Sequence, residues 1–548
     1  MDYKREYERW LREADDEELL CELRDMTQAQ IEDAFYRPLA FGTGGLRGTL
    51  GAGTNRMNIY VVARASLGLA RYIGRGGSVV IGYDSRLKSD VFARTAAGVF
   101  AACGVQVYIW PELLPVPTVS YAVRKLRASA GVMITASHNP AQYNGYKVYG
   151  PDGCQITTEV AAAILAEIEK LDFFRDTCSI PFEEGLQNGS INYIDDSVLT
   201  AFLEEIRGQS VLYGDEIDRD VAIVYSPLNG TGLKPVTRAL SEAGFHNITV
   251  VEEQREPDGR FPTCPYPNPE IREAMELGLR YCERVNADLL LATDPDCDRC
   301  GIAVRRPDGT YQLLSGNEVG LLLLDYICAQ RVKHGKMPAH PTFVKTIVTM
   351  DLAEKIAGHY GVKTVNVLTG FKFIGEVIGR MEDERDYICG FEESYGYLTG
   401  SYVRDKDGVD AAFMIAEMFA FYKTRGISLL QKLEEIYRSY GYCLNTLHSY
   451  TFPGSAGMEQ MARIMTDFHR GLDSVGGEQV IRTDDYSVGL NGLPKSNVLK
   501  FHTGCGSVVV RPSGTEPKLK TYISVTAEDR EHAAEIEKRI AADLEKRF

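Results

Sequence analysis

Apolar and polar positions follow one another along the chain in a repeating order of short apolar run, polar loop and amphipathic stretch. The apolar run from Ser78 to Tyr83 ends at Asp84, and the segment from Ser89 to Cys103 that follows it has helical spacing. Further apolar runs cover 105–110 and 130–134, and the same order restarts near residues 221 and 342. Strands that alternate with amphipathic helices predict α/β units. We therefore expect three similar α/β domains with mixed, largely parallel sheets.

The C-terminal part of the chain has a different pattern. Helical spacing over 455–469 is followed by apolar runs at 498–501, 507–510 and 520–525, and then by a helix from Asp529. This order predicts an α+β domain appended to the α/β domains. Polar, turn-rich segments predict the boundaries, which gives four domains around a central active-site cleft: 1–207, 208–335, 336–446 and 447–548.

Composition and charge exclude several classes of protein. The 548 residues carry 76 acidic and 60 basic side chains, a net charge of −16, and 44% of them are hydrophobic, which is ordinary for a globular protein. The negative field opposes binding to nucleic acid and to anionic membranes. No apolar run approaches the ~20 residues of a membrane span, and the N-terminus lacks a secretory pattern. We expect a cytoplasmic monomer or weak homo-oligomer.

The twelve cysteines are scattered without the spacing of a disulfide framework, so we expect buried free thiols. Cys297 and Cys300 form a C-x-x-C pair, which is typical of redox sites or of half a zinc site. A second pair with zinc-site spacing does not follow, and this disfavours zinc.

Three carboxylates, Asp294, Asp296 and Asp298, stand at alternating positions directly after a strongly apolar run. Carboxylates this close converge only if a cation offsets their repulsion, and hard oxygen ligands favour Mg²⁺ or Ca²⁺. An EF-hand does not fit, because Arg299 stands where that loop needs glycine. A solvated acidic turn is the alternative, but the apolar run that leads into the cluster favours a metal site.

Ser137 and His138 follow the apolar run 130–134 within the sequence T-A-S-H-N-P, and Lys147 lies shortly downstream. The segment lacks the G-x-S-x-G form of a hydrolase, and by spacing alone it fits a capping serine in an ordinary turn. Ligands of open parallel sheets bind beyond the carboxyl ends of the strands. We therefore expect the loops at Ser137, Asp294 and Glu392 to form one composite site.

The segment R-P-S-G-T-E-P-K at 511–518 groups cations and hydroxyls around a glycine that lets backbone N–H groups approach an anion. It suits a phosphate that is bound but not transferred, although a plain turn fits equally well. The residues concerned are Arg511, Ser513, Gly514, Thr515 and Lys518.

Three weaker signals complete the set. Arg47, in the glycine-rich segment T-G-G-L-R-G, is suited to clamp a phosphate. Glu392 and Ser394 offer acceptors for sugar hydroxyls, or begin a helix. Lys406, in R-D-K-D-G, supplies a cation to a substrate or belongs to a solvated loop.

Together, and in this order from Phe41 to Tyr522, these segments resemble the α-D-phosphohexomutase superfamily, and in particular its phosphoglucomutase branch. T-A-S-H-N-P followed by N-G-Y-K is similar to the family's phosphoserine loop, which implies that Ser137 is phosphorylated. The resemblance implies His138 and Lys147 as candidates for the general base and places Arg47 in the active site. D-P-D-C-D-R resembles the metal loop, although Pro295 and Cys297 stand where many relatives carry glycine.

The metal loop of the family implies Mg²⁺ on the three aspartates and on an oxygen of phospho-Ser137, with Arg299 close to the phosphate. Similarity of L-T-G-F-K, F-E-E-S-Y-G and R-D-K-D-G to the family's sugar loops implies substrate contacts from the following residues: Thr369, Gly370, Glu392, Ser394 and Lys406. R-P-S-G-T-E-P-K resembles the second phosphate loop.

The activity that the resemblance implies is the interconversion of glucose 1-phosphate and glucose 6-phosphate. The reaction would pass through a phosphoserine and glucose 1,6-bisphosphate, which also serves as activator. Phosphopentomutase and phosphomannomutase activities are alternatives, with Ser394 similar to the glucose-handling group. A phosphatase is disfavoured because it needs only one phosphate segment, and a silent scaffold because Ser137 and the aspartates are retained.

Overall fold

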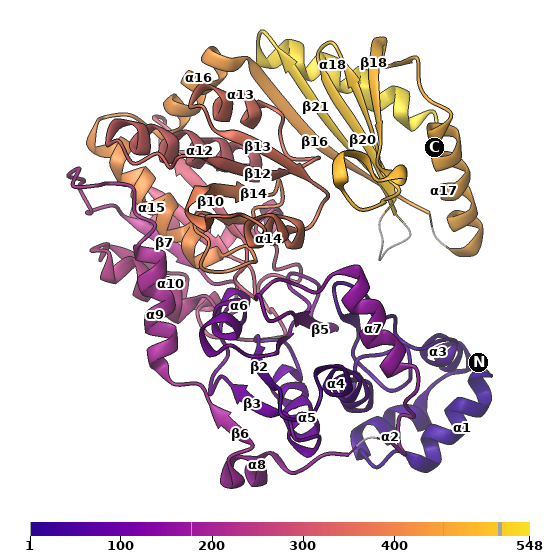
Figure 1. Ribbon diagram of the computed structural model, residues 1–548. Coiled ribbons are helices and arrows are strands. Elements are labelled where there is room, and N and C mark those ends of the chain that lie inside the picture. The colour runs from indigo at the N-terminus through magenta and orange to yellow at the C-terminus, as the bar shows by residue number, and fades with distance from the viewer. Residues whose placement is uncertain (1, 177, 453, 513–517) are drawn as a thin grey trace. The chain divides into compact units, whose positions relative to one another are not determined.

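The computed structural model describes residues 2–176, 178–452, 454–512 and 518–548, which belong to two compact units (Figure 1). The first unit comprises Met1–Leu314, Ile374–Tyr387 and Tyr395–Phe421. The second unit comprises Ser315–Phe373, Ile388–Ser394 and Tyr422–Phe548. Within the described residues, no helix combines the length and the apolar character that crossing a membrane requires.

A six-stranded sheet organises the N-terminal part of the first unit, with the order β1-β5-β4-β2-β3-β6. β2, β3, β4 and β6 run parallel, whereas β5 is antiparallel to β4 and β1. Every residue of β4 is buried, as expected for an interior strand of such a sheet. The strands are β1 (Leu46–Thr49), β2 (Ser78–Tyr83), β3 (Gln106–Ile109), β4 (Ala130–Ile134), β5 (Tyr143–Tyr149) and β6 (Ile191–Tyr193).

Helices between these strands pack onto the sheet, and three more precede it. The fully buried indole of Trp10, in α1, meets four aromatic rings edge to face, and these contacts fix the N-terminal helices to the rest of the unit. The helices are α1 (Tyr3–Glu13), α2 (Glu17–Asp25), α3 (Gln28–Phe35), α4 (Ile59–Ile73), α5 (Ser89–Ala102), α6 (Val116–Leu126), α7 (Thr158–Ile168), α8 (Phe182–Asn188) and α9 (Asp196–Arg207).

A second sheet in the first unit has the order β11-β10-β9-β7-β8. β7, β8 and β9 run parallel, and β10 reverses direction directly after the tight loop that follows β9. The elements are β7 (Ile223–Ser226), α10 (Leu233–Glu242), β8 (Ile248–Val250), α11 (Arg272–Val285), β9 (Leu289–Thr293), β10 (Cys300–Arg305) and β11 (Tyr311–Leu314). β15 (Tyr397–Leu398) and most of α15 (Gly408–Thr424) also belong to this unit.

The second unit contains a smaller sheet and then an antiparallel sheet. In the smaller sheet β12 lies between β13, to which it is parallel, and β14. α12 begins at a capping box in which Ser315 and Glu318 satisfy each other's backbone N–H groups. The elements are α12 (Gly316–Lys333), β12 (Thr342–Thr346), α13 (Leu352–His359), β13 (Lys363–Val367), β14 (Tyr387–Phe391) and α16 (Leu429–Tyr440). Most of α14 (Phe371–Gly379) belongs to the first unit.

The C-terminal sheet has the order β16-β21-β20-β19-β18-β17, with antiparallel pairs throughout. α18, drawn yellow in Figure 1, packs against β16 and β21. The elements are β16 (Tyr442–Thr451), α17 (Gly454–His469), β17 (Ser474–Val475), β18 (Glu478–Asp485), β19 (Leu499–Thr503), β20 (Gly506–Pro512), β21 (Lys518–Ala527) and α18 (Arg530–Glu545). The expectation of α/β domains with mixed, largely parallel sheets followed by an α+β domain is thus confirmed.

Candidate active site

The loop after β4 holds Ser137 in an unusual backbone conformation. Its φ angle of 54° lies in the left-handed region, which non-glycine residues adopt only where their surroundings impose it. The Ser137 N–H donates to Thr135 Oγ1 at 2.8 Å, so the turn is closed by a side chain of its own loop. Ser137 Oγ donates to Asp294 Oδ2 at 3.1 Å and lies 3.2 Å from His138 Nδ1. The predicted nucleophile therefore meets the predicted metal loop.

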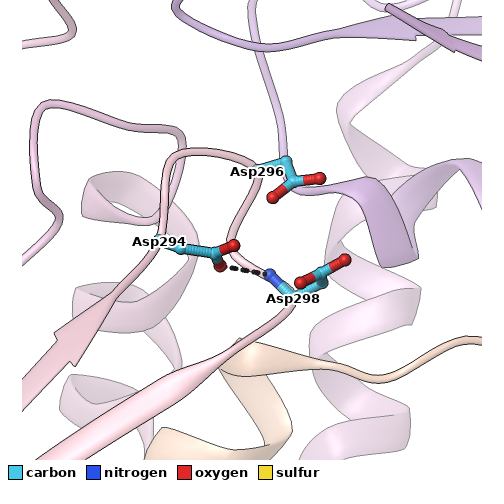
Figure 2. Close-up of side chains that lie close together, drawn as sticks. All are labelled: Asp294, Asp296 and Asp298. Atoms are coloured by element: carbon cyan, nitrogen blue, oxygen red, sulfur yellow. Dashed lines mark hydrogen bonds between the residues drawn. The ribbon is translucent and has the colours of Figure 1, made fainter. Parts of the chain in front are cut away.

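The three aspartates form a buried cluster between β9 and β10 (Figure 2). One carboxylate oxygen from each lies within 4.8 Å of the others. The loop is tight because Cys297 takes a left-handed φ of 52° and Asp294 Oδ1 accepts the N–H groups of Asp298 and Arg299 at 3.1 and 3.0 Å. Pro295 and Cys297, which stand where many relatives carry glycine, thus lie in a tight loop in which all three carboxylates still converge.

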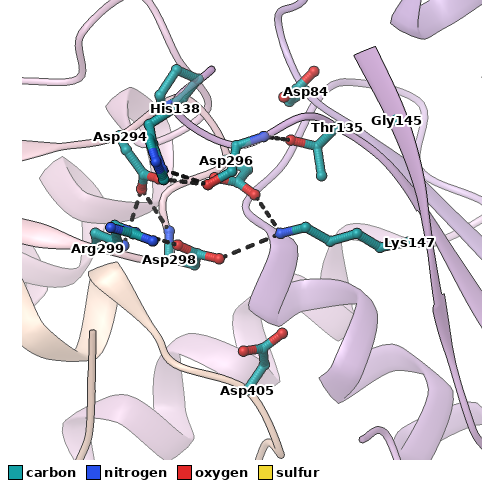
Figure 3. Close-up of polar contacts among 12 residues, drawn as sticks. Asp84, Thr135, His138, Gly145, Lys147, Asp294, Asp296, Asp298, Arg299 and Asp405 are labelled. Carbon is teal, nitrogen blue, oxygen red and sulfur yellow. Dashed lines mark hydrogen bonds and ion pairs between the residues drawn. The ribbon is translucent and has the colours of Figure 1, made fainter. Parts of the chain in front are cut away.

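Two lysines neutralise part of this cluster, and Figure 3 shows one of them, Lys147, pointing at Asp296 and Asp298. Lys147 lies on β5, which pairs with β4 in antiparallel register, and its Nζ is 2.8 Å from Asp296 Oδ2 and 3.5 Å from Asp298 Oδ2. Lys406 Nζ approaches the same Asp298 oxygen at 2.8 Å. The resemblance implies a substrate contact for Lys406, and in the structure its ammonium lies beside the carboxylates of Asp298 and Asp405.

The ionisable groups of the site shift one another's pKa values. Burial, together with the neighbouring carboxylates, raises the pKa of Asp294 well above its ordinary value. Burial would also raise the pKa of Asp296, but Lys147 outweighs burial and lowers it. Burial opposes the charge of Lys147 too, yet the two aspartates raise its pKa overall, so the lysine stays protonated. Burial and the nearby Arg299 lower the pKa of His138 well below its ordinary value and leave the imidazole neutral at pH 7.

The donor set fits a hard divalent cation. Asp296 Oδ1 and Asp298 Oδ1 are buried and have no hydrogen-bond partner in the described part of the chain. Buried carboxylate oxygens are rarely left in this state unless something else satisfies them, and oxygen-only ligands are those that Mg²⁺ and Ca²⁺ prefer. The C-x-x-C alternative is disfavoured, because burial raises the pKa of Cys300 to about 12 and so opposes the thiolate that zinc needs.

Two arginines border the site. Arg47, on β1 opposite Gly145 of β5, is exposed, and its Nη1 donates to Asn139 Oδ1 at 3.3 Å. The Arg299 side chain forms an ion pair with Glu270 while its backbone N–H binds Asp294. Both predicted cations therefore lie beside the Ser137 and Asp294 loops.

The remaining predicted residues belong to the second unit. The Arg511 guanidinium donates to Thr369 Oγ1, and the Gly370 N–H donates to Glu392 Oε1 at 3.0 Å. Ser394 is half-buried, and Lys518 opens β21. This second group joins the predicted phosphate loop to the predicted sugar loop. Three predicted residues lie outside the described ones: Ser513, Gly514 and Thr515.

Sequence reasoning missed three buried charged residues around the site. Asp84 and Arg86 follow β2, and Asp405 accepts from Tyr149 Oη at 2.9 Å and from Gln155 Nε2 at 3.0 Å. For Asp84 and Arg86, the sequence does contain an indication: the D-S-R segment directly follows a mostly apolar strand. The aspartate cluster was predicted because it stands in the same kind of position.

The expectation that the cysteines are buried thiols is confirmed for most of them. Within the described residues the twelve cysteines are thiols rather than disulfides, and most are buried, whereas Cys21 and Cys178 are exposed.

A serine hydroxyl beside three buried carboxylates and two ammonium groups is the kind of site that phosphoryl transfer uses, since that reaction depends on positioning and charge neutralisation. Four family descriptions match the chain in order: the phosphoglucomutase/phosphomannomutase α/β/α domains I (38–175), II (200–309) and III (315–440), and the family's C-terminal domain (455–543). The chain belongs to the phosphoglucomutase/phosphomannomutase family and is an enzyme of the isomerase class.

Relatives of known name are similar over nearly the whole chain. A phosphoglucomutase from Staphylococcus saprophyticus is 35% identical over 92% of this chain and 95% of its own length. One from Staphylococcus aureus is 34% identical, covering 96% and 97%. Among solved structures, the Paramecium phosphoglucomutase parafusin in its open form has a TM-score of 0.70 at 16% identity, covering 93% of this chain and 95% of its own. A family member from Burkholderia thailandensis has a TM-score of 0.68 at 18% identity, covering 92% and 97%; both share the fold.

Proposed function

We propose that this enzyme is a phosphoglucomutase that interconverts glucose 1-phosphate and glucose 6-phosphate through phospho-Ser137 and glucose 1,6-bisphosphate. The observation that carries the proposal is the contact of Ser137 Oγ with Asp294 at the edge of the carboxylate cluster. The named Staphylococcus relatives, which match over nine-tenths of the chain, support glucose phosphate as substrate. The family description also names phosphomannomutase, which makes mannose phosphate the second candidate.

In this mechanism Ser137 carries the phosphoryl group between two hydroxyls of the sugar. Phospho-Ser137 transfers its phosphoryl group to the free hydroxyl of the hexose phosphate, and the proton that this hydroxyl loses ends on Ser137 Oγ as the serine–phosphorus bond breaks. The bisphosphate then turns over and Ser137 Oγ attacks the other phosphorus. The proton that the serine loses ends on the sugar oxygen that leaves, so that the phosphoenzyme is regenerated and the isomeric monophosphate departs. The phosphorus–oxygen bonds made and broken are equal in number.

The chain's own residues have distinct parts in these steps. Neutral His138, with Nδ1 3.2 Å from Ser137 Oγ, is the acceptor we assign to the serine proton. We assign Lys147, whose pKa Asp296 and Asp298 raise against the effect of burial, the part of supplying positive charge. Asp294, Asp296 and Asp298 would hold Mg²⁺, which when bound supplies positive charge to the phosphoryl oxygens. We assign the phosphate that is not transferred to Arg511 and the sugar to Thr369, Gly370 and Glu392. Cysteines that remain as thiols in the described part of the chain support a reducing compartment such as the cytoplasm.

The test replaces the proposed nucleophile. Ser137→Ala should lose mutase turnover by several orders of magnitude and should take up no phosphoryl group from labelled glucose 1,6-bisphosphate. Ser66→Ala is the matched control, because it also removes a buried hydroxyl that makes a side-chain hydrogen bond in the same unit. Near-normal turnover in Ser137→Ala would exclude the phosphoserine mechanism. Comparing kcat/KM for glucose 1-phosphate, mannose 1-phosphate and ribose 1-phosphate on the wild type identifies the sugar.

A further inference from the structure

Arg86 is a completely buried cation whose guanidinium faces the backbone of the Ser137 loop. Its Nε donates to the Ser137 carbonyl at 3.1 Å, and its Nη1 donates to the carbonyls of Pro140 and Tyr143 at 2.9 and 3.0 Å. Nη2 donates to the carbonyls of Ser137 and Asn139. A guanidinium has five N–H donors, so every one of them is used on the seven residues that begin at the nucleophile.

The surroundings of Arg86 hold the guanidinium in this position. Asp84, at the end of β2, accepts the Arg86 N–H at 3.0 Å and places a carboxylate oxygen 3.6 Å from Nε. The buried ring of Phe261 lies against the guanidinium, with the centroid 5.1 Å from Cζ. The side chain is therefore fixed by an ion pair and by a cation–π contact, and its five bonds are made by a group with little freedom to move.

Two of the Arg86 hydrogen bonds are accepted by Ser137, the residue of the loop whose backbone is strained. Ser137 has a φ of 54°, and a non-glycine residue keeps this strained left-handed conformation only where neighbouring contacts offset its cost. Two donors on the Ser137 carbonyl fix the peptide plane after the nucleophile, and that plane sets the direction in which Oγ points toward Asp294.

We propose that Arg86 is a positioning residue for the phosphoryl-transfer step: it holds the backbone of residues 137–143 so that Ser137 Oγ faces the carboxylate cluster. No hydrogen bond of Arg86 reaches the reacting oxygen or the three aspartates, so its effect on the position of Ser137 passes through the backbone, while its positive charge acts on Asp294 and Asp296 through space. The inference rests on the proposed function, because it concerns the transfer step of that reaction.

The experiment compares Arg86→Ala and Arg86→Lys with the wild type in the full-length enzyme, at saturating Mg²⁺ and glucose 1,6-bisphosphate. A displacement of about 1 Å at the reacting atoms costs on the order of a hundredfold, so Arg86→Ala should lower kcat by about that factor while KM for glucose 1-phosphate changes little. Lysine has three donors on a point charge and cannot reach four carbonyls in one plane, so it should restore kcat only in part. Millimolar methylguanidinium should raise the kcat of Arg86→Ala by occupying the vacated space.

Arg64 offers a matched control in the same unit. Its Nε also donates to a backbone carbonyl, that of Leu171 at 2.9 Å, and its guanidinium also lies on a phenylalanine ring, that of Phe173 at 4.4 Å. Arg64→Ala should lose stability in a thermal melt, keep kcat, and gain nothing from methylguanidinium.

The outcomes separate the inference from the proposed function. A wild type without mutase activity on any of the three sugar phosphates would remove the function itself. An active wild type with unchanged kcat in Arg86→Ala would overturn only the positioning role. If Arg86→Ala does not fold, Arg86→Lys decides: a folded lysine variant with wild-type kcat overturns the inference, and one with reduced kcat and wild-type KM supports it.

Discussion

Asp410 is a buried carboxyl group whose replacement should make the protein more stable. It lies in the first turn of α15, where Oδ2 accepts the Thr399 N–H at 2.8 Å and Oδ1 lies 2.7 Å from the Thr399 hydroxyl. Burial first, and Asp407 second, raise the pKa of Asp410 to about 8. We predict that Asp410→Asn increases the free energy of unfolding at neutral and alkaline pH.

The sign and the size of the change in stability follow from the raised pKa of Asp410. The folded-state pKa is raised above the unfolded value of about 3.9, so the stability that the protonated carboxyl contributes is complete below pH 4 and is lost as the pH rises toward 8. At about 1.4 kcal/mol for each pH unit, the loss between pH 5 and pH 8 is about 4 kcal/mol. Asparagine is neutral at every pH, and its amide can bond the same Thr399 groups because a hydroxyl both donates and accepts. One unpaired amide hydrogen costs about 1–2 kcal/mol at all pH values.

Urea unfolding followed by tryptophan fluorescence measures this effect, because both tryptophans of the chain, Trp10 and Trp110, belong to the unit that contains Asp410. The stability difference between Asp410→Asn and the wild type should grow in favour of the variant by about 4 kcal/mol from pH 5 to pH 8. Asp407→Asn is the control. Burial first raises the pKa of Asp407 to about 6, so the gain in stability of this variant over the wild type should stop increasing above that pH. A difference that is flat with pH, or that favours the wild type at pH 8, would refute the reasoning.

Two further predictions concern the ligand-binding groups. Asp296→Asn should lower kcat, and Mg²⁺ should raise the melting temperature of this variant less than that of the wild type, because one of three charged ligands is lost. Turnover that survives both this change and thorough chelation would contradict a metal role. Arg511→Ala should raise KM and lower kcat, with only partial rescue by lysine, while hydrolysis of the phosphoenzyme by water changes little. Equal loss of both rates would show that Arg511 supports the fold rather than the remote phosphate.

The parts of the site that the sequence predicts are those that the chain builds from local contacts. Asp294, Asp296 and Asp298 share one tight turn, and Ser137, His138 and Lys147 share one hairpin. Proximity within each group follows from spacing and strand reversal, whereas the contact of Lys147 with Asp296, 149 positions away, depends on how the two sheets pack. Strand centres were predictable for the same reason, because a buried strand such as β4 is apolar at every position.

The parts that the sequence does not predict depend on which strands become neighbours. Arg86 meets Ser137 because β2 lies next to β4, with β3 on its other side, although 51 positions separate the two residues in the chain. Strand order cannot be read from apolar runs, so the D-S-R segment looked like an ordinary strand end. Lys406 is a similar case: its place beside Asp298 depends on the backbone bond from the Gly408 N–H to the Cys297 carbonyl, which no local pattern indicates.

The charges around Ser137 help to explain why the pKa of Asp294 is raised whereas that of Asp296 is lowered. Three buried carboxylates face two ammonium groups, Lys147 and Lys406, so full ionisation leaves one negative charge in excess. The raised pKa of Asp294 corresponds to a proton that removes this excess, whereas Asp296 keeps its charge beside Lys147. A phosphoryl group on Ser137 adds between one and a half and two further negative charges at the oxygen that contacts Asp294. A divalent cation in place of the Asp294 proton adds one net positive charge, which offsets about half to two-thirds of that addition, so we expect the phosphoserine and the cation to stabilise each other at this site.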